Sequence, residues 1–181
     1  FFRQLALALH TNQPYKLLIV AAPYPFNNSP TGVWDKWFDY VEIGKVADYV
    51  SPMTYLDHGP WSPPGPICDY STFVKNYKEI IKMISARKVL VGLPLFGCMW
   101  LPNKESAEKN PLEITAWGLE NMLVPYFDAV SKEAVINKDG VGVAYMPTPS
   151  GLAMRMEEVA KLGCGGVAFW RLGTADANYF K

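Results

Sequence analysis

Ala47-Asp48-Tyr49-Val50-Ser51-Pro52-Met53 is a short, largely apolar stretch that predicts a strand, and Thr54-Tyr55-Leu56-Asp57-His58 follows it with aromatic and polar side chains. The same order, an apolar run and then an aromatic or polar segment, recurs along the chain. Residues 16–22 form a continuous apolar run that Pro23 ends, which is typical of a strand buried on both faces. Residues 88–94 and 166–170 predict two more strands of this kind.

Helical patterns and loops separate these strands. We predict helices over residues 34–46, 72–85, 114–134 and 152–162, with Asp69 or Ser71 capping the second and Ser150 the last. Residues 59–66 contain four prolines and two glycines and must be a loop, and residues 141–145 predict a short additional strand.

Alternating parallel strands and helices indicate an α/β fold. The loops after the strands are rich in Trp, Tyr and Asp, as at the C-terminal face of a (β/α)₈ barrel, where active sites are built. Such a barrel takes about 250 residues, whereas this chain has 181 and only four strand–helix units. We therefore predict that residues 1–181 are the C-terminal half of a TIM (β/α)₈ barrel, comprising strands 5–8 with their helices. The chain also begins at Phe1, without Met and within an amphipathic pattern, as a fragment or processed product does.

Composition narrows the functional classes. Lys plus Arg and Asp plus Glu balance at 17 each without a basic cluster, which argues against nucleic acid and anionic membranes as partners. The longest apolar runs are far shorter than the roughly 20 residues of a membrane span. Three scattered cysteines and two histidines argue against a metal site. Buried thiols fit a reducing compartment somewhat better than a secreted disulfide scaffold.

Three motifs, in this order, resemble the C-terminal half of glycoside hydrolase family 18, the family of chitinases and of endo-β- and peptidoglycan N-acetylglucosaminidases. Met53-Thr54-Tyr55 matches the Met-x-Tyr-Asp of the sixth barrel strand, although Leu56 stands where the family has Asp. Gly92-Leu93-Pro94-Leu95-Phe96-Gly97, with Trp100 nearby, matches the seventh strand. Gly165-Gly166-Val167-Ala168-Phe169-Trp170, with Asp176 downstream, matches the eighth.

The resemblance implies substrate-assisted catalysis, in which the acetamido oxygen of the sugar attacks its own anomeric carbon, without a cofactor or metal. It implies that Tyr55 positions that acetamido group and that Trp170 forms the floor of the sugar site. Asp57 is a candidate substitute for the missing Asp, since a bulge or turn could bring it into the site. Further substrate-binding candidates are Tyr24, Met53, Trp61 and Trp100. The two tryptophans are expected on loops, where an exposed indole more often contacts a ligand than packs. His58 beside Asp57 is more often structural in such a loop.

The family's general acid, the Glu of an Asp-x-x-Asp-x-Asp-x-Glu motif, is absent from these residues and by barrel order belongs upstream of Phe1. Three hypotheses therefore stand. The chain belongs to a glycosidase acting on chitin, peptidoglycan or N-glycan cores; or it is a catalytically inactive sugar-binding relative; or it is a half-barrel that self-associates through open strand edges. The resemblance slightly favours a secreted or cell-envelope protein, and the cysteines argue mildly for the opposite.

Overall fold

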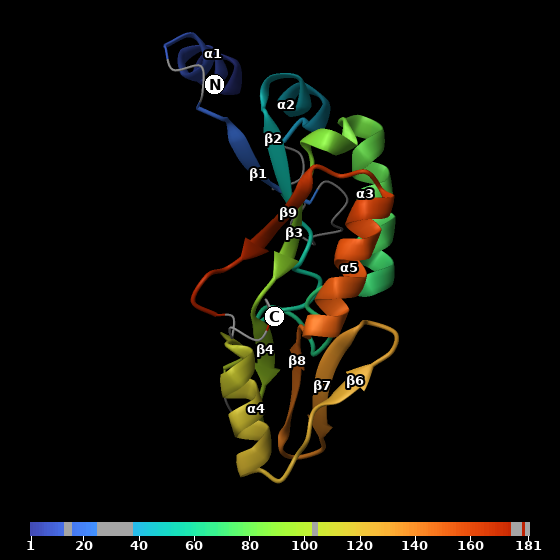
Figure 1. Ribbon diagram of the computed structural model, residues 1–181. Helices are drawn as coiled ribbons and strands as arrows, with labels where there is room; N and C mark the ends of the chain where they lie inside the picture. The colour runs from blue at the N-terminus through green and yellow to red at the C-terminus, as the bar shows by residue number, and fades with distance from the viewer. Residues whose placement is uncertain (13–15, 25–37, 103–104, 175–178, 180–181) are drawn as a thin grey trace. The chain divides into compact units, whose positions relative to one another are not determined.

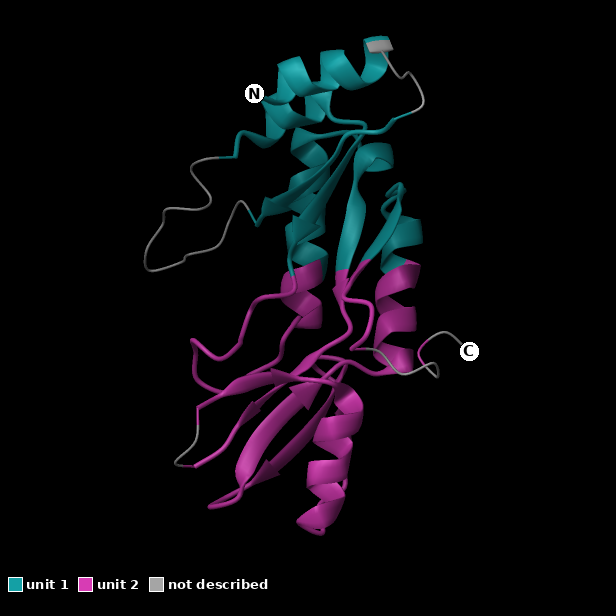
Figure 2. Ribbon diagram, turned by 90° about the vertical axis from the view of Figure 1, so that its left-hand side faces the viewer, with its two compact units in different colours: residues 1–54, 74–92, 158–168 teal, residues 55–73, 93–157, 169–181 magenta. Residues whose placement is uncertain are grey.

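The structure is a computed structural model that describes residues 1–12, 16–24, 38–102, 105–174 and 179 (Figure 1). The chain divides into two compact units (Figure 2). The first comprises residues 1–54, 74–92 and 158–168, and the second comprises residues 55–73, 93–157 and 169–181. Among the described residues, no helix combines the length and the apolar character needed to cross a bilayer.

The predicted parallel strands lie wholly or partly in the first unit. β1 (Ile19–Pro23) and β2 (Tyr49–Met53) pair in parallel over their full length, from Ile19 opposite Tyr49 to Pro23 opposite Met53. A parallel bridge joins Val50 to Val89, directly before β3 (Leu90–Pro94), and β3 is hydrogen-bonded to β9 (Gly166–Trp170). The predicted strands are therefore confirmed, β9 with the predicted bounds and the others with bounds shifted by up to three residues. The predicted burial on both faces was wrong for β1, in which exposed and buried residues alternate and Ile19 is 52% exposed.

Several of the described helices begin at a polar cap. The described helices apart from α4 are α1 (Phe2–Asn12), α2 (Tyr40–Val46), α3 (Tyr70–Met83), the 3₁₀ turn η2 (Ala86–Lys88) and α5 (Pro149–Lys161). Asp69 caps α3 as predicted, since its carboxylate accepts the N–H of Thr72 at 2.9 Å. The predicted cap of α5 was wrong: the Thr148 hydroxyl, and not Ser150, accepts the N–H of Gly151 at 2.9 Å. Gly163, with φ +67°, ends α5 in the left-handed conformation that glycine adopts without strain.

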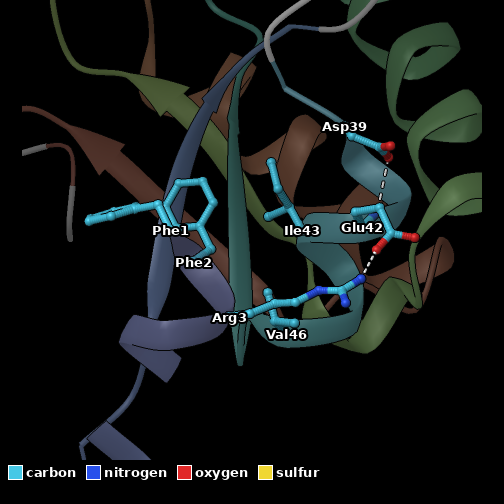
Figure 3. Close-up of a pocket in the computed structure, with 7 residues that line it drawn as sticks. All are labelled: Phe1, Phe2, Arg3, Asp39, Glu42, Ile43 and Val46. Carbon is cyan, nitrogen blue, oxygen red and sulfur yellow. Dashed lines mark hydrogen bonds and ion pairs between the residues drawn. The ribbon is translucent and has the colours of Figure 1, made fainter. Parts of the chain in front are cut away.

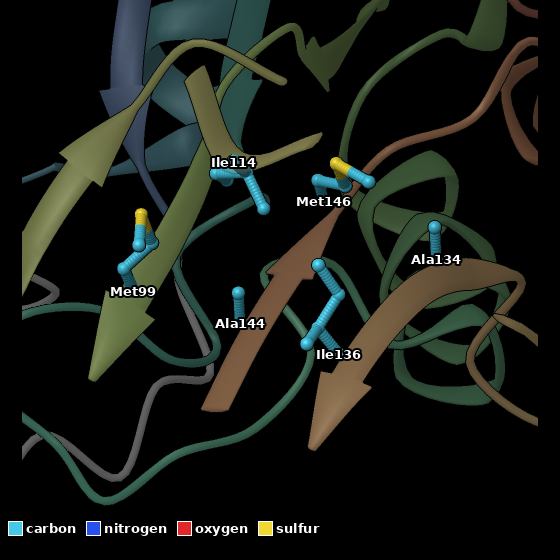
Figure 4. Packing of buried hydrophobic residues seen from close by; sticks show 6 residues of the cluster. All are labelled: Met99, Ile114, Ala134, Ile136, Ala144 and Met146. Carbon is cyan, nitrogen blue, oxygen red and sulfur yellow. The ribbon is translucent and has the colours of Figure 1, made fainter. Parts of the chain in front are cut away.

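The second unit contains a five-stranded antiparallel sheet, of which the sequence analysis predicted one strand, residues 141–145, now seen at residues 142–146. Its strands, in spatial order, are β5 (Ala107–Lys109), β4 (Gly97–Trp100), β8 (Gly142–Met146), β7 (Glu133–Lys138) and β6 (Tyr126–Asp128). Helix α4 (Pro111–Glu120) adds Ile114 to a buried cluster from the strands (Figure 4), whose members are Met99, Ile114, Ala134, Ile136, Ala144 and Met146. Burying a side chain of the size of Ile or Met stabilises a fold by roughly 1.5–3 kcal/mol, so this cluster gives the sheet a core of its own.

The predicted helix over residues 114–134 was wrong beyond Glu120. Helix α4 ends there, and β6 and the start of β7 follow. The turns on either side of β6 place Met122 at φ +58° and Lys132 at φ +61°, conformations that usually require Gly or Asn. Neither turn carries glycine, but Pro125 inside the predicted helix was a signal for its end that the sequence analysis overlooked.

Candidate functional site

Tyr55 lies two residues after β2 and belongs to the second unit. Its side chain is buried, and its ring packs edge-on against Phe96 with 6.3 Å between the ring centroids. Burial, with a smaller contribution from Glu108, raises the pKa of the Tyr55 hydroxyl to about 12. The hydroxyl makes no hydrogen bond to another described residue. At neutral pH the Tyr55 hydroxyl is therefore protonated and can donate a hydrogen bond, and no described residue accepts one from it.

Trp170 ends β9 and is half exposed, at 50% of its full accessible surface. Its carbonyl oxygen accepts the N–H of Leu95 at 2.6 Å. Since Leu95 precedes Phe96, this bond brings the segment that packs on Tyr55 next to the end of β9. The second unit thus gathers Tyr55, Phe96 and Trp170, which the sequence places on three separate segments.

Trp61 lies in the predicted loop, which the structure confirms as a run of turns and bends over residues 57–64. Its side chain is 62% exposed, and its ring lies so close to Gly59 that a Cβ there would come within 2.5 Å of it. The neighbouring His58 is fixed by contacts of its Nδ1 with the Pro63 carbonyl oxygen at 3.0 Å and the Ser62 hydroxyl at 3.3 Å. Trp61 is the residue of this loop that offers an open aromatic face.

Trp100 differs from the prediction. It was expected on an exposed loop, but it lies in β4 and is only 7% exposed. Its Nε1 donates to the Ser62 carbonyl oxygen at 2.9 Å, and its ring packs edge-on against Tyr145. The antiparallel sheet supplies the strand partners that bury it, so Trp100 supports the loop around Ser62.

Asp57 faces the backbone of its own loop. Its carboxylate accepts the N–H of Asp69 at 2.8 Å, and its own N–H donates to the Ile67 carbonyl oxygen at 3.1 Å. Burial, opposed in part by that N–H, raises the pKa of Asp57 to about 6. Both bonds hold the two ends of the loop together, which is a structural role that the sequence did not indicate.

Two buried charged residues, Glu133 and Arg155, hold the far end of this loop and were missed by the sequence analysis. They are 1% and 2% exposed. The Glu133 carboxylate accepts the N–H groups of Ile67 and Cys68 at 3.0 and 2.8 Å. The Arg155 guanidinium donates to the carbonyl oxygens of Cys68 and Ser131, and its Nη2 lies 3.9 Å from Glu133 Oε1.

Aromatic rings complete the surroundings of Arg155. Its guanidinium carbon lies 5.7 Å from the Tyr70 ring centroid and 5.8 Å from that of Phe73, within the range of cation–π attraction. We call Glu133 and Arg155, with the backbone of Ile67 and Cys68, the loop clip. It joins the loop to β7 and to α5.

Tyr24 and Met53 belong to the first unit. Tyr24 follows β1, and its hydroxyl donates to the side-chain oxygen of the buried Asn76. Met53 is half-buried at the end of β2, opposite Pro23. Asp176 lies outside the described residues.

A pocket of the first unit is lined by residues of α1 and α2 and of the turn before α2 (Figure 3): Phe1, Phe2, Arg3, Asp39, Glu42, Ile43 and Val46. Arg3 pairs with Glu42, and Asp39 accepts the Glu42 N–H at 2.9 Å as the cap of α2. Each charged side chain of this pocket thus has a local partner, so we assign it no catalytic role.

Comparison with known sequences decides the family. The sequence model of glycosyl hydrolases family 18 matches residues 1–175. The chain belongs to glycosyl hydrolase family 18. A relative, the "Uncharacterized glycosylase YvbX" of Bacillus subtilis strain 168, is 33% identical over 89 residues, which cover 49% of this chain and 26% of that protein.

Solved structures agree with the family. The chitinase from Chromobacterium violaceum ATCC 12472 has a TM-score of 0.87 at 22% identity, covering 99% of this chain and 57% of that chain. The spore cortex-lytic enzyme SleL of Bacillus megaterium QM B1551 has a TM-score of 0.82 at 20% identity, covering 98% of this chain and 42% of that chain. At these identities the likeness establishes a mixed α/β fold of the family 18 type. The chain spans 57% or less of each of these proteins.

The buried carboxyls of this family 18 chain predict an unusual pH dependence of stability. The pKa of Asp57 rises from 3.8 to about 6 and that of Glu133 from 4.5 to about 7, mainly through burial. Between the unfolded and folded values the folded state binds more protons, so its stability increases as the pH falls through this window. We expect the melting temperature of the chain to rise from about pH 7 to about pH 5.

The matched variant Asp57→Asn keeps an oxygen acceptor for the Asp69 N–H. It should reduce the rise in melting temperature between about pH 7 and about pH 5. Below about pH 4 the trend should reverse, because hydrogen bonds lower the pKa of carboxyls such as Asp128, through Ser131, and Asp48, through the Leu18 N–H. Thermal unfolding across this pH range checks both statements; a melting temperature that falls steadily from pH 7 to 5 would contradict the first.

Proposed function

We propose that this chain supplies the substrate-binding half of a family 18 glycoside hydrolase that cleaves β-linked glycans containing N-acetylglucosamine. The observation that carries the proposal is Tyr55: a buried ring, held against Phe96, with a protonated hydroxyl that has no acceptor among the described residues. Such a donor suits an acetamido carbonyl oxygen of a bound sugar.

In the proposed mechanism, the Tyr55 hydroxyl donates to the acetamido oxygen and aligns it with the anomeric carbon. That oxygen attacks the anomeric carbon while a general acid protonates the departing glycosidic oxygen, and water then opens the cyclic intermediate with overall retention. The half-exposed Trp170 indole provides an apolar floor for the sugar ring. The reaction needs no cofactor or metal.

We further propose that the chain corresponds to strands 5–8 of the barrel. The links from β1 to β2, from β2 to the start of β3, and from β3 to β9 support this. The preceding half would carry the catalytic Glu, and an isolated half-barrel would expose edges that favour self-association. The solution mass of the purified chain tests that association.

A catalytically inactive sugar-binding protein is the second candidate, and Leu56 favours it. In family 18 an Asp directly follows the Tyr of this motif, whereas Leu56 cannot accept a hydrogen bond from sugar. Asp57 does not replace it in the described structure, since its carboxylate accepts the Asp69 N–H.

Hydrolysis of a fluorogenic chito-oligosaccharide separates these candidates. We expect the chain alone to show no measurable turnover, because loss of a positioned general acid costs roughly 10²–10⁴-fold. The chain extended by its own upstream coding sequence should hydrolyse the substrate, and replacement of the upstream Glu by Gln should abolish this. Turnover by the chain alone would contradict the assignment of the acid to the missing half. Binding without turnover by the extended chain would establish the sugar-binding alternative.

A further inference from the structure

Strand β5 carries a carboxylate, Glu108, on the face of the antiparallel sheet that is turned away from α4. In the ladder between β4 and β5, Met99 lies opposite Ala107 and Cys98 lies opposite Glu108. Met99 belongs to the buried cluster that also contains Ile114 of α4. Because neighbouring residues of a strand point to opposite faces, Cys98 and Glu108 project from the other face of the sheet.

This other face meets the loop that begins after Tyr55. Trp100 of β4 projects from it as well, and its Nε1 donates to the Ser62 carbonyl oxygen at 2.9 Å. Phe96, which packs on Tyr55, lines a pocket together with Glu108. Burial is the main cause of the raised pKa of Tyr55, and the charge of Glu108 adds to it. The strand register, the shared neighbour Phe96 and this electrostatic effect agree in placing the Glu108 carboxylate near the Tyr55 hydroxyl.

The Glu108 carboxylate is available for a ligand. It is exposed, and it makes no ion pair or hydrogen bond with another described residue. Glu113 of the same pocket is engaged, since it lies 3.5 Å from Lys109 and accepts the Asn110 N–H at 3.0 Å. Asp57 is engaged by a backbone N–H of its own loop at 2.8 Å. Of these three carboxylates, Glu108 is therefore the one that can accept a hydrogen bond from a bound sugar.

A donor and an acceptor beside one pocket suit a pyranose, which offers hydroxyl donors as well as oxygen acceptors. Tyr55 is the donor, and Leu56 directly after it has no polar side-chain atom that could act as the acceptor. We propose that Glu108 is a further substrate-binding residue, whose carboxylate accepts a hydrogen bond from a hydroxyl group of the sugar chain bound at Tyr55. A charged acceptor makes a stronger hydrogen bond than a neutral one. This inference rests on the proposed function.

Arg171 offers a competing explanation for any effect of Glu108. It lines the same pocket and is exposed, and its guanidinium makes no ion pair or hydrogen bond with another described residue. If Glu108 acted on binding only by pairing with Arg171, removing either charge would have the same effect. If Glu108 contacts the sugar directly, a neutral ligand should respond to Glu108 and not to Arg171.

The test is the binding of chitotetraose, a neutral ligand, to the purified chain and its variants, measured by isothermal titration calorimetry. We expect Glu108→Ala to weaken binding about 10-fold, as loss of a hydrogen bond to a charged group does. Glu108→Gln keeps a neutral acceptor and should weaken binding less. The melting temperature should not change, because the carboxylate has no partner to lose among the described residues.

Glu120→Ala is the matched control, because Glu120 is an exposed glutamate at the end of α4 without an ion pair in the described structure. It should leave the affinity unchanged, and Arg171→Gln should leave it within about 2-fold. An unchanged affinity of Glu108→Ala would overturn this inference and leave the proposed function intact. Equal losses for Glu108→Ala and Arg171→Gln would also overturn it, in favour of an ion pair. Failure of the unaltered chain to bind chitotetraose would overturn the proposed function as well.

Discussion

Replacing Arg155 by Met is expected to lower the free energy of unfolding by about 3–5 kcal/mol, the usual result of breaking a buried ion pair from one side. The change leaves Glu133 buried, 1% exposed, without the guanidinium that lies 3.9 Å from it. It also removes the donor to the carbonyl oxygens of Cys68 and Ser131. Chemical denaturation of the two chains measures the difference.

The control for this variant is Arg87→Met, the same substitution at an exposed position, which should change the free energy of unfolding by less than about 0.5 kcal/mol. A double variant, Arg155→Met with Glu133→Leu, removes the stranded charge but leaves the N–H groups of Ile67 and Cys68 unsatisfied. It should therefore recover only part of the lost stability. A loss below about 1 kcal/mol for Arg155→Met alone would show that the loop clip is not important for the fold.

Tyr55→Phe should have the largest effect on function. In the extended, catalytically complete protein we expect kcat to fall by roughly 10²-fold, because the acetamido oxygen loses the hydrogen bond that aligns it with the anomeric carbon. The fold should be unaffected, because the ring contact with Phe96 persists and the hydroxyl makes no hydrogen bond to a described residue. Steady-state kinetics together with the melting temperature of the variant test this.

Tyr77→Phe provides a control with the same chemical change and the opposite result. The Tyr77 hydroxyl is fully buried; it donates to the Pro52 carbonyl oxygen at 3.1 Å and accepts the Gly92 N–H at 2.8 Å and the Thr54 hydroxyl at 2.8 Å. Its removal should lower the free energy of unfolding by about 1–3 kcal/mol. If Tyr55→Phe instead destabilised the chain as much as Tyr77→Phe, Tyr55 would be structural.

The parallel strands could be predicted from the sequence because each is a short apolar run that a turn or polar segment ends. Residues 16–22 contain β1 apart from its last residue, and residues 166–170 coincide with β9. The helices were predicted where caps and periodicity agree, as at Asp69 before α3. In these segments local propensity and tertiary environment favour the same structure.

Most of the antiparallel sheet was not predicted, because its strands are short. The turn between β7 and β8 contains Asp139-Gly140, a hairpin signal that the sequence analysis did not use. β5 and β6 have three residues each, too few to show alternation. Trp100 was assigned to a loop for this reason, and its burial follows from strand partners that lie 45 residues away, as at Met99 opposite Ala144.

The candidate site was predicted only in part. Tyr55 follows a predicted strand and Trp170 ends one, so their placement near strand ends could be inferred. The loop clip could not be predicted. Glu133 lies within a wrongly predicted helix, and Arg155 appears in the sequence as an ordinary helix-surface residue. A buried ion pair depends on contacts between distant segments, which periodicity does not report.

The loop clip has a consequence for how this protein can diversify. Because Glu133, Arg155 and Asp57 secure both ends of the loop through backbone groups, the intervening residues around Trp61 carry little of the fold's stability. Insertions and substitutions in surface loops with fixed ends change the free energy of folding only slightly. A chain that keeps the clip should therefore accept different residues at this tip without losing the scaffold.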